Sequence, residues 1–66
     1  MTVTLNGLPT SLDPGTTVAR LVSDRSLPST GVAVAVNGSV VRAADWDRTA
    51  LADGDAVEIV TARQGG

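Results

Sequence analysis

The sequence predicts an α+β domain in which a mixed sheet of about five strands wraps around one helix. Short apolar runs are joined twice by Asn-Gly, at residues 6–7 and 37–38, and this dipeptide is typical of two-residue hairpin turns. Val18, Leu21 and Val22 have the i, i+3, i+4 spacing of one helical face. Two hairpins and one crossover helix are therefore expected.

The first hairpin begins with a half-buried strand. Over residues 2–6, Val3 and Leu5 alternate with polar side chains, which is the period of a strand with one buried face. A second short strand is expected over residues 8–12. Pro9 cannot donate a hydrogen bond to a neighbouring strand. The second strand should therefore lie at a sheet edge, with the Pro9 position facing solvent.

The helix is expected over about residues 17–25, after a turn at residues 13–15. Thr16 or Thr17 stands where an N-cap belongs, because a threonine hydroxyl can accept from the free N–H groups of the first turn. So short a helix is marginal by itself and depends on packing against the sheet. Leu27 follows in the next loop as its expected anchor.

The second hairpin is expected to pair residues 32–36 with residues 39–42. The first of these runs reads Val-Ala-Val-Ala-Val, which places branched side chains on one face, toward the helix, and alanines on the other. Residues 43–52 show no strand alternation, and a helical turn is expected around Trp46. The indole of Trp46 should close one end of the core.

The last strand is expected over residues 56–62, after a tight Asp-Gly-Asp turn. It has apolar residues on both faces, which suggests a central strand with neighbours on either side. The handedness of crossover connections favours a place between the two hairpins, parallel to the first strand. This arrangement is a ubiquitin-like β-grasp, with the domain over residues 1–62 and a flexible tail over residues 63–66.

The composition excludes several functions. The chain contains no His, Cys or Lys, so it lacks a conventional nucleophile–base pair, and we do not expect it to be an enzyme. The net charge is −2 and the arginines are scattered, which argues against nucleic-acid binding. No apolar run approaches a membrane span and no signal-peptide pattern is present, so a cytoplasmic location is expected. The acidic residues lack the pattern of a calcium-binding loop and are interpreted as turn and cap residues, without a metal site or a bound cofactor: Asp45, Asp47, Asp53 and Asp55.

The sequence ends in Gly65-Gly66, whose terminal carboxylate would be unprotected. With glycine at about 7% of average usage, such a pair arises by chance in roughly one chain in 200. The pair is therefore suggestive but not specific, and most chain ends are simply frayed.

The whole chain resembles the family of sulfur carrier proteins of thiamine biosynthesis. The resemblance is carried by the Asn-Gly hairpin before Val40-Val41, by Trp46, by the Asp-Gly-Asp turn at residues 53–55, and by the terminal Gly65-Gly66. It implies that an E1-like adenylyltransferase uses ATP and Mg²⁺ to convert the Gly66 carboxylate into an acyl-adenylate. Sulfur from a persulfide donor then gives a thiocarboxylate, from which a thiazole synthase takes the sulfur. Gly65 would give the tail access to a narrow partner active site, because glycine has no Cβ.

Partner contacts are expected on the exposed sheet face and at the residues nearest the tail. The expected contact residues are Val60, Ala62, Arg63 and Gln64. The alternatives are a sulfur carrier of molybdopterin or cysteine synthesis, or a ubiquitin-like protein modifier or interaction module. The sulfur acceptor distinguishes the carriers from one another, and conjugates that disappear without the glycines would identify a modifier.

Overall fold

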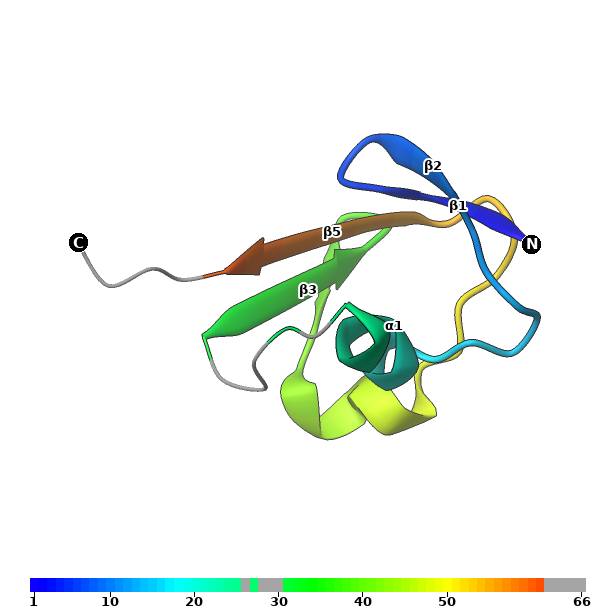
Figure 1. The fold of residues 1–66 in the computed structure, drawn as a ribbon. Coiled ribbons are helices and arrows are strands. Elements are labelled where there is room, and N and C mark those ends of the chain that lie inside the picture. Colours follow the sequence, from blue (N-terminus) through cyan, green and yellow to red (C-terminus); the bar gives the residue numbers. More distant parts are fainter. Residues whose placement is uncertain (26, 28–30, 62–66) are drawn as a thin grey trace.

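A computed structural model describes residues 1–25, 27 and 31–61, and shows a five-stranded sheet with one α-helix against one face (Figure 1). The elements in chain order are β1 (Thr2–Leu5), β2 (Leu8–Ser11), α1 (Val18–Asp24), β3 (Val32–Val36), β4 (Ser39–Val41), the 3-10 helix η1 (Ala43–Arg48) and β5 (Ala56–Thr61). The predicted α+β class and the β-grasp arrangement are confirmed. The boundary that we predict between a domain of residues 1–62 and a tail of residues 63–66 lies outside the described residues.

The sheet order is β2-β1-β5-β3-β4, so β5 lies between the two hairpins. It runs parallel to β1, with Leu5 opposite Val57, and antiparallel to β3, with Val34 opposite Ile59. Both features of the predicted topology are therefore correct. The strand that comes last in the sequence is central in the sheet.

Both Asn-Gly pairs form the turns that were predicted from them. Asn6 and Gly7 have φ angles of 50° and 84°, and Asn37 and Gly38 have φ angles of 52° and 85°. Positive φ at both central residues is characteristic of a type I′ turn, whose twist matches that of the flanking strands. Each turn thereby fixes the register of its hairpin.

Pro9 lies on the outer strand β2, opposite Thr4, and is exposed. Because Thr4 and Pro9 form a non-hydrogen-bonded pair of the hairpin, the backbone of residue 9 points away from β1. A proline at this position removes an N–H from the free edge without breaking the ladder. The predicted edge location of β2 is confirmed.

The helix α1 is shorter than predicted by one residue at each end. Thr17 is the N-cap: its hydroxyl accepts a 3.1 Å hydrogen bond from the backbone N–H of Arg20. The buried positions Val18, Leu21 and Val22 are the three that give the apolar spacing in the sequence. Leu27 is half-buried and packs against this core, as expected.

The core lies between α1 and the sheet and is closed by η1. Among the residues that the structure describes, nine apolar residues are buried in this core, namely Val3, Leu5, Val18, Leu21, Val22, Val34, Trp46, Leu51 and Val57. Trp46 is 6% exposed and donates from its indole Nε1 to the carbonyl of Val41 at 2.9 Å. Its predicted role at the end of the core is confirmed. In the described part of the chain, neither helical segment is long and apolar enough to cross a membrane.

Candidate functional site

Of the residues predicted to act at the site, only Val60 lies within the described structure, on the central strand β5. Ala62, Arg63, Gln64, Gly65 and Gly66 lie outside the described residues. The described part of the candidate site is therefore the C-terminal half of β5 and the elements that hold and surround it.

The start of β5 is fixed by the second hairpin turn. The backbone N–H of Asn37 donates to the carbonyl of Ala56 at 2.7 Å, and the side-chain Oδ1 of Asn37 accepts from the N–H of Ala56 at 2.9 Å. Its Nδ2 donates to a carboxylate oxygen of Asp55 at 3.0 Å. One asparagine thus satisfies both backbone groups of the first residue in β5.

Further along, β5 is held by the first hairpin turn. The N–H of Asn6 donates to the carbonyl of Val57 at 2.9 Å. Its side-chain Oδ1 accepts from the N–H of Ile59 at 2.8 Å, and its Nδ2 donates to the Ile59 carbonyl at 3.2 Å. These contacts were not predicted, because the Asn-Gly pair was interpreted only as a turn. A signal was present, since asparagine is the residue that tolerates positive φ and also carries both a donor and an acceptor.

The face of the sheet opposite α1 presents apolar side chains close to the end of β5. Val60 is 63% exposed and lies opposite Ala33 of β3. Gly31, Val32, Ala33 and Val60 line a shallow depression. Val40 on β4 is 75% exposed. The predicted contact residue Val60 is therefore accessible and belongs to an apolar surface of β5, β3 and β4.

A second groove lies on the helix side of the same strand. It is lined by Leu5, Asn6, Leu8, Arg25, Leu27, Ile59 and Thr61. Leu8 is 69% exposed although its register opposite Leu5 places it on the core face. The seven-residue α1 leaves this end of the hairpin uncovered. The last residues of β5 thus pass between two apolar depressions, one on each face.

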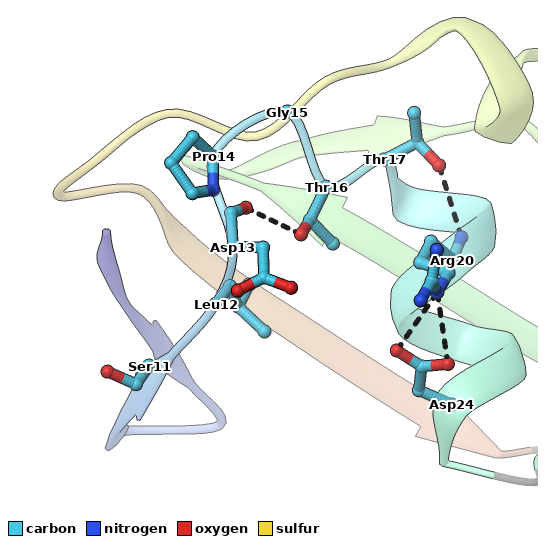
Figure 2. A pocket seen from close by; sticks show the side chains of 9 residues that line it. All are labelled: Ser11, Leu12, Asp13, Pro14, Gly15, Thr16, Thr17, Arg20 and Asp24. Carbon is cyan, nitrogen blue, oxygen red and sulfur yellow. Dashed lines mark hydrogen bonds and ion pairs between the residues drawn. The ribbon is translucent and has the colours of Figure 1, made fainter.

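A more polar pocket lies between the end of β2 and α1 (Figure 2). Two of its three charged side chains are paired with each other, since Arg20 Nε donates to both carboxylate oxygens of Asp24 at 3.2 and 3.3 Å. The hydroxyl of Thr16 donates to the Asp13 carbonyl at 2.6 Å. The loop that forms it is at the opposite end of the molecule from the end of β5 (Figure 1). This pocket is not part of the candidate site.

The acidic residues of the Asp-Gly-Asp turn act as predicted, as backbone acceptors. An oxygen of Asp53 accepts from the N–H of Thr2 at 2.8 Å, and one of Asp55 accepts from the N–H of Ala52 at 2.8 Å. Within residues 1–25, 27 and 31–61, no group of three or more His, Cys, Asp or Glu side chains could hold a metal ion.

Comparison with known proteins identifies a family whose sequence model matches this chain and solved structures with a similar fold. A sequence model of the ThiS family matches residues 3–66. The crystal structure of the thiamine biosynthesis protein ThiS from Geobacter metallireducens gives a TM-score of 0.83 at 35% identity, and the match covers 100% of both chains. A solution NMR structure of a thiamine biosynthesis protein from the same organism gives the same TM-score and identity, over 100% of this chain and 88% of that chain. No curated protein matches the sequence closely.

The family match extends through the two terminal glycines and includes every residue of the candidate site. The structural match covers the whole of this chain, which forms a mixed sheet that wraps around one helix. The chain therefore belongs to the ThiS family, which consists of small sulfur carriers with the ubiquitin-like β-grasp fold.

Proposed function

We propose that this chain is a sulfur carrier for thiazole formation in thiamine biosynthesis, and that the Gly66 carboxylate carries the sulfur. The observation that supports this most directly is the ThiS family match, which reaches residue 66. The full-length likeness to a thiamine biosynthesis protein supports the pathway. The sequence offers no conventional nucleophile–base pair that would compete with this role, because it contains no Cys, His or Lys.

The chemistry requires activation, because a carboxylate resists attack by an anionic nucleophile. An E1-like adenylyltransferase transfers AMP from ATP–Mg²⁺ to the Gly66 carboxylate and releases pyrophosphate. The terminal sulfur of a persulfide then attacks the carbonyl carbon and expels AMP, which gives an acyl disulfide. A thiol reduces its S–S bond and leaves the thiocarboxylate, which a thiazole synthase accepts as sulfur donor while the carboxylate is regenerated. All of these steps take place in partner enzymes, and the carrier supplies only the carboxylate.

The residues around the end of β5 are suited to docking. Val60 offers an exposed apolar side chain on the sheet face opposite α1. We propose that Val60, Ala62, Arg63 and Gln64 contact the partner while Gly65 lets the chain pass through a narrow channel, since glycine has no side chain to clash there. Weak contacts of this kind suit a carrier that must leave one enzyme and bind the next.

The test is the mass of the intact protein. With ATP, Mg²⁺, a persulfide donor and the adenylyltransferase, we expect a gain of about 16 Da as sulfur replaces one oxygen. A variant that lacks Gly66 should fold equally well by circular dichroism and show no gain. Conversion of that variant would overturn the assignment to Gly66, and conjugates to other proteins in place of the mass gain would identify a protein modifier. Transfer of the sulfur to a molybdopterin precursor and not to a thiazole would identify the other carrier pathway.

A further inference from the structure

The carboxamide of Asn6 continues a strand pairing beyond the point where the strand itself ends. β1 stops at Leu5, which lies opposite Val57 of β5. The chain then turns away at Asn6 with φ of 50°. The next backbone groups of β5 on this side are those of Ile59, and the Asn6 side chain bonds both, at 2.8 and 3.2 Å. An amide side chain therefore takes the place of the peptide group that a longer β1 would supply.

This clamp restrains β5 close to the residues proposed to enter the partner enzyme. On its other side β5 pairs with β3 as far as Thr61, which lies opposite Val32. Without the Asn6 side chain, Ile59 to Thr61 would be held from the β3 side only. Ile59 is half-buried, so water could replace the lost bonds and the fold as a whole would persist.

We propose that Asn6 is a positioning residue for the chemistry at Gly66, because it fixes the direction in which β5 delivers the following residues. The inference rests on the proposed sulfur-carrier function. A misplacement of about 1 Å is enough to slow a reaction, so the direction in which β5 ends would affect the rate at a group that follows the strand.

The fold contains a matched control at the opposite end of the same strand. Asn37 has almost the same φ angle, 52°, is also followed by glycine, and its side-chain Oδ1 also accepts from a backbone N–H of β5. Its side chain, however, accepts from the N–H of Ala56, the first residue of β5, and donates to the carboxylate of Asp55, which precedes the strand. If Asn6 only stabilises the fold, substitution of Asn6 and substitution of Asn37 should slow sulfur loading equally. If Asn6 positions the end of β5, substitution of Asn6 should slow sulfur loading more.

The experiment compares Asn6→Gly with Asn37→Gly in the full chain. Glycine accepts the positive φ, so each variant loses the carboxamide while the turn is retained. Amide hydrogen exchange should quicken at Ile59 in the first variant and at Ala56 in the second. The initial rate of the 16 Da mass gain, measured against carrier concentration, should give a kcat about fivefold lower for Asn6→Gly at an unchanged KM. Asn37→Gly should stay within about twofold of the wild type.

Asn6→Asp provides a second variant if the glycine variant does not fold. It keeps an oxygen that can accept from the Ile59 N–H and loses the donor to the Ile59 carbonyl, so an intermediate kcat is expected. Equal kcat values for the Asn6 and Asn37 variants, or an Asn6→Gly kcat like that of the wild type, would overturn the positioning role alone. Failure of the wild type to gain mass would overturn the proposed function, and with it this inference.

Discussion

The indole of Trp46 and the carbonyl of Val41 are joined by a 2.9 Å hydrogen bond. Trp46 belongs to η1 and Val41 ends the edge strand β4, so this bond ties the closing segment of the core to the outermost strand. The indole is otherwise buried, and its one donor is satisfied inside the protein. The bond and the buried ring make separate contributions that substitution can distinguish.

Trp46→Phe keeps an aromatic ring in the core and removes the donor to Val41. We expect the free energy of unfolding to fall by about 1–2 kcal/mol, from the lost hydrogen bond and the smaller ring. Trp46→Ala should cost more, about 3–5 kcal/mol. Because Trp46 is the single tryptophan of the chain, urea unfolding should be followed by far-ultraviolet circular dichroism. Equal losses for the two variants would show that the ring contributes nothing beyond its N–H.

Thr17 is expected to stabilise α1 through its cap. Thr17→Ala removes the oxygen that accepts from the Arg20 N–H and should lower the free energy of unfolding by about 1 kcal/mol. Thr17→Ser keeps the hydroxyl and should recover most of this loss. If serine and alanine destabilise equally in urea titrations, the threonine methyl and not the cap bond is the important group.

The same substitution at Val34 and at Val40 should distinguish the buried face of the second hairpin from its exposed face. Val34 is 1% exposed and Val40 is 75% exposed. Val34→Ala removes buried methyl groups and leaves a cavity, so we expect a loss of about 2–3 kcal/mol. Val40→Ala should change the free energy of unfolding by less than about 0.5 kcal/mol. Comparable urea midpoints for the two variants would contradict the observed orientation of the hairpin.

Val60 is predicted to act in docking and not in folding. Val60→Ser should leave the urea midpoint close to that of the wild type, since the side chain is exposed. It should raise the KM for sulfur loading by about fivefold if Val60 lies near the centre of the partner interface. Leu8→Ser is the control, because Leu8 is similarly exposed but lies on the helix side of the sheet. A KM raised by Leu8→Ser and unaffected by Val60→Ser would place the docking surface on the helix side.

Local sequence signals predicted the elements well because the determining forces are local. Asn-Gly accepts two positive φ angles that other pairs resist, so both hairpins could be placed. The spacing of Val18, Leu21 and Val22 predicted which face of the helix is buried. The order of elements, with the handedness of crossovers, then placed β5 between the hairpins, as observed. These predictions needed no knowledge of contacts between distant residues.

Features that depend on distant contacts were not predicted. The bonds between Asn6 and Ile59 join residues 53 positions apart. The asparagine signals a side-chain donor and acceptor at the turn, but it does not identify Ile59 as the partner. Leu8 lies on the core face by its alternation, yet it is exposed because the length of α1 decides what is covered. The apolar outer face of β5 correctly indicated a central strand, but Val60 faces solvent and is not covered by a second layer. The role of Gly66 stays a prediction from the sequence and the family.

The place of β5 in the sheet also bears on how the protein is made. In the sheet formed by the described residues, the two hairpins do not pair with each other, and only β5 joins them, through β1 on one side and β3 on the other. A nascent chain that stops short of Ala56 therefore contains two separate hairpins, and isolated hairpins are marginally stable in water. The five-stranded sheet can therefore form only after β5 has emerged from the ribosome. Chains that end before β5 should therefore lack the closed sheet and be open to proteolysis.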